Sequence, residues 1–141
     1  MFYRCTALTA APQLPATTLA SSCYSSMFYG CTAITVMPKL PATTLSPSCY
    51  REMFKDCTSL TLSSELRAAT LTSYCYYQMF SGCSKLDNIT MLATNISAKY
   101  CLKELVNDVA AKGTFVKVDS TSLTTGTSGI PSGWTVVNKQ T

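Results

Sequence analysis

The stretch that decides the fold runs from Met27 to Cys57 and reads MFYGCTAITVMPKLPATTLSPSCYREMFKDC. It contains one complete repeat and the start of the next, because Met-Phe pairs occur at 1–2, 27–28, 53–54 and 79–80, always 26 residues apart. Two cysteine columns keep the same period, at 5, 31, 57 and 83 and at 23, 49, 75 and 101. A fixed period of this length indicates coils that stack on one another.

Each repeat divides into three parts. The first, CTAITVMP at 31–38, is short, rich in threonine and ends at proline, which is typical of a short strand. The second, KLPATTL at 39–45, predicts a turn to the opposite side of the coil. The third begins at Ser46-Pro47, a capping hydroxyl followed by proline, and predicts a short helix that ends at a glycine such as Gly30 or Gly82. We therefore expect an α/β solenoid of four 26-residue coils, each with a short parallel strand, a turn and a short helix.

The fourth repeat loses its register and then regains it. One apolar column contains Leu14, Leu40, Leu66 and Leu92, but Ile96 comes one place early for the next column. An extra residue before Cys101 restores the spacing. We expect this slip to lie in the exposed bend between Leu92 and Ile96.

The C-terminal end departs from the repeat. Apolar residues keep helical spacing from Ala98 to Lys112, and strands are predicted at 114–118 and 134–137. A non-repeating end of this kind covers the open apolar face of a last coil. We therefore divide the chain into a solenoid at 1–105 and a C-terminal β cap at 106–141. The first coil has no such cover and Met1 falls within a repeat, so we expect a fragment whose first coil self-associates or frays.

The eight cysteines lie in the two columns, beside columns of leucine and methionine. Buried free thiols pack as small apolar groups, so reduced structural thiols are the favoured state. Disulfides between neighbouring coils remain the alternative. No CxxC pair and no histidine are present, so we expect no metal site and no cofactor.

Composition argues against several classes of function. The net charge of +4 comes from 11 basic and 7 acidic residues without a basic run, so nucleic acid is not an expected partner. No apolar run reaches the ~18 residues of a membrane span. Without histidine, a serine or cysteine nucleophile would need a lysine or carboxylate base. The carboxylates Glu52 and Asp56 lie beside Arg51 and Lys55 in the sequence, and we interpret this group as a solvated face. An enzyme is therefore not expected.

The repeat resembles the leucine-rich repeats of the BspA-like family. That family carries a phrase of the form F-x-G-C-x-S-L-T, with counterparts here at Phe28, Gly30 and 31–35, followed by Leu40-Pro41. The resemblance covers residues 1 to about 105, and the segment GTSGIPSGWTVV resembles the ends of repeat proteins from gut bacteria and their phages. It implies a right-handed leucine-rich-repeat solenoid that serves in adhesion or partner binding, at a bacterial cell surface, in secreted form or on a phage particle. It implies no shared catalytic residues.

Columns that vary from coil to coil within a fixed frame indicate where a partner would bind. On or beside the expected sheet, the face that stacked repeats commonly present to partners, we select eight candidate residues. These are Val36, Met37, Lys39, Leu62, Ser63, Glu65, Asn88 and Met91. The tyrosine column at 24, 50 and 76 suits either burial or sugar binding. We expect a non-catalytic recognition or adhesion module for a protein or glycan; the alternative is a structural spacer of a larger surface or phage tail protein.

Overall fold

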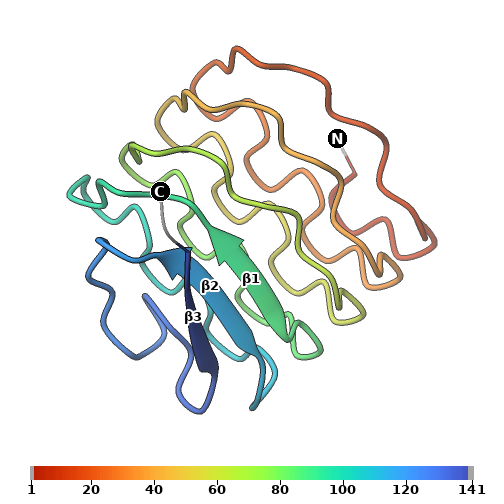
Figure 1. Cartoon of the computed structure of the whole chain (residues 1–141). Helices are drawn as coiled ribbons and strands as arrows, with labels where there is room; N and C mark the ends of the chain where they lie inside the picture. The colour runs from red at the N-terminus through yellow and green to blue at the C-terminus, as the bar shows by residue number, and fades with distance from the viewer. Residues whose placement is uncertain (1, 140–141) are drawn as a thin grey trace.

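The computed structural model describes residues 2–139 as coils stacked one on another, from the N-terminal end to a small sheet at the other end (Figure 1). The sheet has three parallel strands in the order β1-β2-β3, which are Asn88–Met91, Thr114–Val118 and Thr135–Lys139. Successive coils are held together by backbone hydrogen bonds between residues 25 positions apart, such as that from the Tyr50 amide to the Cys75 carbonyl at 3.1 Å. The 26-residue repeat of the sequence is therefore the unit that stacks.

The prediction of helices is wrong. The predicted α/β leucine-rich-repeat solenoid, which includes these helices, is therefore wrong as well. Residues 2–139 contain no helix. Each predicted helix is a run of consecutive turns, which we call a turn ribbon; the four ribbons span 21–30, 47–56, 73–82 and 99–108. In the second ribbon, the amides of Arg51 and Met53 donate to carbonyls three residues earlier, Ser48 at 3.3 Å and Tyr50 at 3.2 Å. The alternate amides of Tyr50, Glu52 and Phe54 donate instead to the next coil.

Left-handed residues make this alternation of hydrogen bonds possible. Ser48, Glu52 and Asp56 have φ of 58°, 53° and 58°, so every fourth residue of the ribbon turns the backbone away from a helical path. The other ribbons have equivalent residues, with glycine at the last place in two of them (Gly30 and Gly82). A helix would direct every amide along its own axis, whereas this path directs every second amide to the neighbouring coil.

The strand side, which carries 35–45 and the equivalent residues, is paired mainly in the last coils. Val36 and Leu62 form an isolated parallel bridge, as do Thr18 and Thr44. A full strand, β1, forms only in the fourth repeat, where Thr90 replaces a proline found at position 38 in the second. Proline lacks an N–H and cannot donate to a ladder, which accounts for the first two coils. The predicted strand of the third coil has no proline and is also absent, with isolated bridges at Leu62 and Leu66 in this coil.

The register slip lies earlier than predicted. Leu66 bridges Met91, 25 residues later, rather than Leu92. Met91 is 1% exposed and occupies the leucine column, whereas Leu92 is only half-buried. The residue that the fourth coil lacks is therefore missing before the end of β1. It is not missing in the bend after Leu92.

The core consists of columns that run along the stack. The Phe2, Phe28, Phe54 and Phe80 rings are stacked with centroids 5.3–6.2 Å apart. Tyr50 and Tyr76 are 2% and 1% exposed and also stack, at 6.1 Å, so this tyrosine column belongs to the core rather than to a sugar site. The leucine columns and the buried cysteines fill the space between these rings.

The cysteines are free thiols, and one of their columns bonds neighbouring coils. Sγ of Cys57 donates to the Phe28 carbonyl at 3.0 Å, and Sγ of Cys83 donates to the Phe54 carbonyl at 3.0 Å. Burial raises the pKa of Cys57 to about 12, so this thiol keeps the proton that it donates. A cysteine here fills an apolar column and still supplies a donor, which alanine or valine would not.

The C-terminal residues close the stack. The strand predicted at 114–118 is present as β2, and Phe115 from this strand joins the same core as the repeats. Trp134 is also buried in that core, and its Nε1 donates to the Ala110 carbonyl at 2.7 Å. Thr121 Oγ1 donates to the Ala93 carbonyl at 2.7 Å, which ties the loop after β2 to the fourth coil.

Replacement of Ser48 distinguishes a turn ribbon from a helix. At φ of 58°, Ser48→Gly should be more stable than Ser48→Ala by about 1 kcal/mol, because only the alanine carries a Cβ in the left-handed region. In a helix the order would be reversed by a similar ~1 kcal/mol. Urea unfolding of both variants measures the difference. The same pair at Ser73, which is not left-handed, is the control and should favour alanine.

Thiol titration tests the packing of the cysteine columns. Native protein should react at exposed Cys23 and, more slowly, at half-buried Cys5, while the six buried thiols stay unreactive. Burial both blocks access and raises the pKa of Cys49 and Cys75 to about 12. Denatured protein should yield all eight thiols. A denatured count near zero would instead show a disulfide framework.

Candidate functional site

The eight predicted binding residues do not form one exposed face. Val36 and Leu62 lie side by side and are each 50% exposed. Lys39 and Glu65 are exposed and Ser63 is half-buried; all three line one hollow of the strand side. These five residues are the part of the prediction that the structure brings together at the surface.

Met37 and Met91 are misplaced in that prediction, because they are core residues only 2% and 1% exposed. Met37 follows exposed Val36 and points to the opposite side of the coil, as successive residues of an extended chain do. Met91 takes the place of a core leucine because of the one-residue slip.

Asn88, the eighth residue, holds two coils together. Its Nδ2 donates to the Thr61 carbonyl at 2.9 Å, and its Oδ1 accepts from the Ser63 amide at 3.3 Å. The amide side chain therefore replaces backbone pairing between the third coil and β1. We assign Asn88 to the frame of the site rather than to the surface that a partner would touch.

Two adjoining hollows on the strand side form a groove across the first three coils. One hollow, of about 440 Å³, lies between the second and third coils, and the other, of about 530 Å³, lies between the first and second. They share Lys39 and Pro41. We call the two together the proline groove; its lining residues are Ala11, Gln13, Leu14, Pro15, Pro38, Lys39, Leu40, Pro41, Ser63, Ser64, Glu65 and Arg67.

The prolines account for the position of the groove. Pro15, Pro38 and Pro41 have no amide hydrogen, so these positions cannot bond to the adjacent coil as a ladder would. The coils remain less closely joined there than at β1 and β2, which pair over four residues without interruption. The groove is therefore built into the frame and does not depend on a mobile segment.

The groove combines apolar walls with a few charged groups. The prolines and Ala11 provide the apolar surface that a ligand can reach, because Leu14 and Leu40 are buried. Lys39, Glu65 and Arg67 add two positive charges and one negative charge. Apolar concave surfaces with a small number of charged groups are typical of ligand sites. It offers no histidine, and no metal-binding group of three His, Cys, Asp or Glu occurs among residues 2–139.

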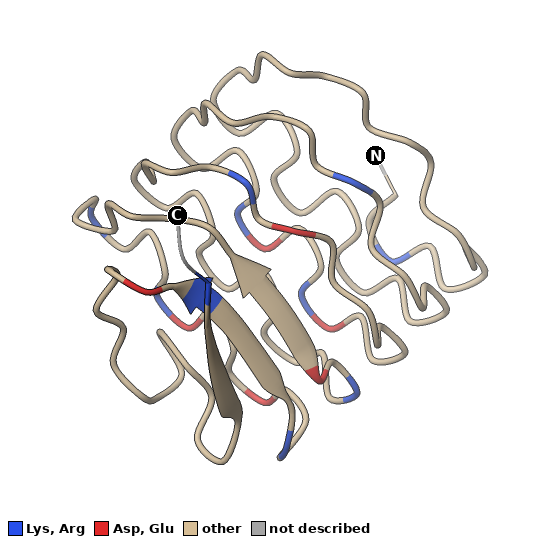
Figure 2. Cartoon of the chain, in the orientation of Figure 1, with Lys and Arg blue, Asp and Glu red and all other residues tan. Residues whose placement is uncertain are grey.

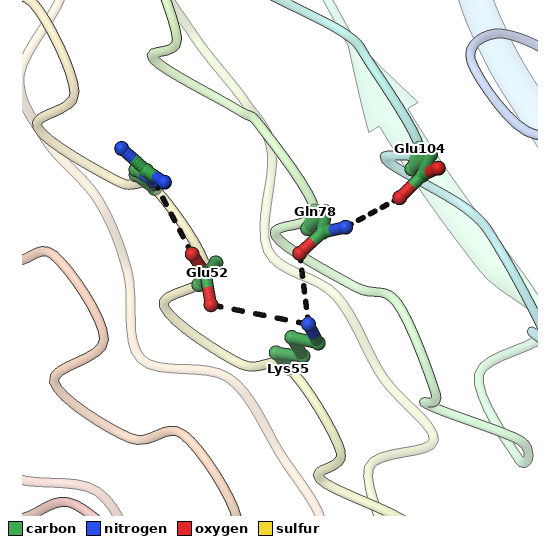
Figure 3. A network of polar contacts seen from close by, with 5 residues as sticks. Glu52, Lys55, Gln78 and Glu104 are labelled. Carbon is green, nitrogen blue, oxygen red and sulfur yellow. Dashed lines mark hydrogen bonds and ion pairs between the residues drawn. The ribbon is translucent and has the colours of Figure 1, made fainter.

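The opposite face of the stack carries a second polar surface, which connects three turn ribbons (Figure 3). Lys55 Nζ donates to Gln78 Oε1 at 2.8 Å and lies 3.9 Å from Glu52 Oε2. Gln78 Nε2 in turn donates to Glu104. The face predicted to be solvated is thus a chain of contacts between coils. The polar groups of these residues form hydrogen bonds and ion pairs largely with one another.

Beside this chain lies an aromatic cluster that the sequence analysis missed. The Arg51 guanidinium lies over the Tyr74 and Tyr77 rings at 5.6 and 5.0 Å, and Lys103 lies over the Tyr100 ring at 4.7 Å. The rings of Tyr74 and Tyr100 meet edge to face at 5.3 Å. Tyr74 and Tyr100 are 26 residues apart, so the repeat alignment could have revealed this pair.

Charge is spread over the molecule rather than gathered on one face. Basic and acidic positions occur in small mixed groups on several coils (Figure 2). The described part of the chain has no helix that could cross a membrane.

Comparison with known proteins returns no matching family model, curated protein or solved structure. The BspA-like resemblance of residues 1 to about 105, and the bacterial or phage location that it implies, therefore stay predictions.

Asn88 and Glu65 should respond differently to truncation. Asn88→Ala should destabilise by about 1–3 kcal/mol, because it removes two hydrogen bonds between coils and leaves the half-buried Ser63 amide without its partner. Glu65→Ala, at an exposed position, should change stability by less than ~0.5 kcal/mol. Denaturant unfolding of both variants measures the contrast. Equal effects would show that Asn88 is not part of the frame.

Proposed function

We propose that this protein is a non-catalytic recognition module that binds an extended segment of a partner protein in the proline groove. One observation carries the proposal: a groove with fixed apolar walls has Lys39, Glu65 and Arg67 at its edges. Next to these charges lie Val36 and Leu62, whose side chains are 50% exposed on the same side of the stack. Exposed apolar side chains beside fixed charges are typical of a surface that buries part of a partner.

A peptide suits the groove better than a glycan. Sugars pack on aromatic rings, and the lining of the groove contains none. A partner segment with an acidic residue for Lys39 and Arg67 and a basic residue for Glu65 would match the charges of its edge. Apolar side chains of the segment would then contact the prolines.

Two alternatives have observations of their own. A glycan would fit the half-buried rings of Tyr74 and Tyr77 and the exposed ring of Tyr100 better than the groove. The cations beside these rings favour an acidic sugar. A structural spacer would need no binding surface, and the bonds that join each coil to the next make the stack suitable as one. Both alternatives predict that the groove is inert.

A displayed library of random dodecapeptides tests the proposal. Peptides selected on the native protein should lose at least tenfold in affinity for the Lys39→Ala/Glu65→Ala variant, because both edge charges are removed. The variant should unfold at nearly the same urea concentration as the parent, since both positions are exposed.

The matched control is Arg51→Ala/Lys55→Ala, which changes two charged residues on the opposite face. This double variant should bind the selected peptides as the parent does. Peptides that bind all three proteins alike, or bind only when Arg51 and Lys55 are intact, would place recognition outside the groove. A library that yields no binders, together with a glycan array that gives none, would favour the spacer.

A further inference from the structure

Two segments of the fourth coil have the pattern Asn-x-Ser/Thr, Asn88-Ile89-Thr90 and Asn95-Ile96-Ser97. In this pattern the side-chain amide nitrogen of the asparagine is the acceptor of an N-linked sugar. The pattern is short, so by itself it does not identify a modification site. The two asparagines have different surroundings in the folded chain, and the difference decides which of them a sugar donor can reach.

Both hydrogens of the Asn88 amide are already used. Nδ2 donates to the Thr61 carbonyl at 2.9 Å and to Asp87 Oδ1 at 3.1 Å. An asparagine amide has two N–H donors, so this nitrogen has none left. Asn88 is also half-buried at the start of β1 (Figure 1). To accept a sugar, Asn88 would have to give up its contacts between coils.

The amide of Asn95 has the opposite arrangement. Asn95 is exposed, and its Oδ1 accepts from the Ser97 amide at 3.1 Å and from Ser97 Oγ at 2.7 Å. A backbone amide can only donate, so the oxygen end of the side chain is the end that faces Ser97. Nδ2, at the other end, forms no hydrogen bond with any residue of 2–139. This nitrogen is therefore accessible and uncommitted.

The backbone holds this segment in place. The Asn95 amide donates to the Ala69 carbonyl at 3.0 Å, and the Asn95 carbonyl accepts from the Leu71 amide at 3.0 Å. Ile96 packs against the core, whereas Asn95 and Ser97 on either side of it are exposed. Successive side chains of an extended chain point to opposite sides, so the amide and the hydroxyl share the outer side.

We propose that Asn95 is a site of N-linked glycosylation, with a sugar diphosphate as the donor. Nδ2 forms a bond to carbon 1 of the sugar and loses one proton to a base of the transferase. The bond from carbon 1 to the diphosphate oxygen breaks, and the diphosphate leaves with the electron pair. Ser97 acts as a positioning residue, because its hydroxyl holds Oδ1 and so turns Nδ2 toward the donor. Asn95 does not line the proline groove, so this site is independent of the proposed peptide site.

The test uses the folded chain, UDP-glucose and a soluble glucosyltransferase that modifies asparagine in Asn-x-Ser/Thr. Mass spectrometry of proteolytic fragments locates the added hexose. Asn95 should be modified at least tenfold faster than Asn88, because only Asn95 has a free and exposed Nδ2. Synthetic peptides of residues 84–92 and 91–99 are the control. Both should accept glucose at similar rates, since neither retains the contacts between coils.

Variants separate the roles of the two side chains. Asn95→Gln should abolish the modification at this position, and Ser97→Ala should slow it at least tenfold because the hydrogen bond to Oδ1 is lost. Ser97→Thr keeps the hydroxyl and should retain the parent rate. Both positions are exposed, so the variants should unfold near the same urea concentration as the parent. A folded chain that carries no hexose at Asn95, or that is modified equally at Asn88, would overturn the proposal.

Discussion

The alternation of hydrogen bonds in the turn ribbons is the interaction on which the rest of the structure depends. One amide closes a turn within its own coil, and the next amide bonds to the neighbouring coil, as Met53 and Phe54 do at 3.2 and 3.0 Å. A left-handed residue at every fourth position permits this path. Because each ribbon bonds to the next over its length, the coils are locked in register, and equivalent side chains fall into columns. The stacked phenylalanines and tyrosines are consequences of that register.

The cysteine columns show how side chains reinforce this arrangement. A thiol is small and apolar enough for the core, yet Cys57 and Cys83 each donate to a phenylalanine carbonyl of the preceding coil. The same carbonyl of Phe28 also accepts from the Cys31 amide at 3.1 Å, so one acceptor serves both the turn and the contact between coils. Burial raises the pKa of these thiols, which keeps them protonated and able to donate. Disulfides are not needed to hold the coils together.

Prolines divide the strand side into a paired part and an open part. In the last coils, β1 pairs with β2 over four residues and the sheet is continuous. The third coil also lacks prolines here, but on this side it forms isolated bridges such as those at Leu62 and Leu66. Where Pro38 and Pro41 occur, the ladder stops and the proline groove lies between the coils. The proposed binding site thus arises from a local failure of strand pairing within a frame that the turn ribbons hold fixed. Residues such as Lys39 and Glu65 can differ from coil to coil because they do not take part in that frame.

The sequence by itself determined the 26-residue unit and the stacking of its cysteine, phenylalanine and leucine columns, because equal spacing can be read along the chain. It also determined the strand at 114–118, because apolar alternation is a local property of the chain. It did not determine the conformation of the ribbons. Apolar pairs such as Cys49-Tyr50 and Met53-Phe54 recur every four residues, which over two turns resembles a helix of 3.6 residues per turn. Only the backbone hydrogen bonds to the next coil favour the turn ribbon over a helix.

The binding face shows the same limit. Of the residues selected from the sequence, Val36, Lys39, Leu62, Ser63 and Glu65 lie at the surface or in the groove, but the sequence could not tell that Met37 and Met91 face the core. Which of two successive residues points inward depends on the neighbouring coil, and the place of Met91 is set by its bridge to Leu66. Tertiary structure decided these features because each of them is a contact between coils rather than a property of one coil.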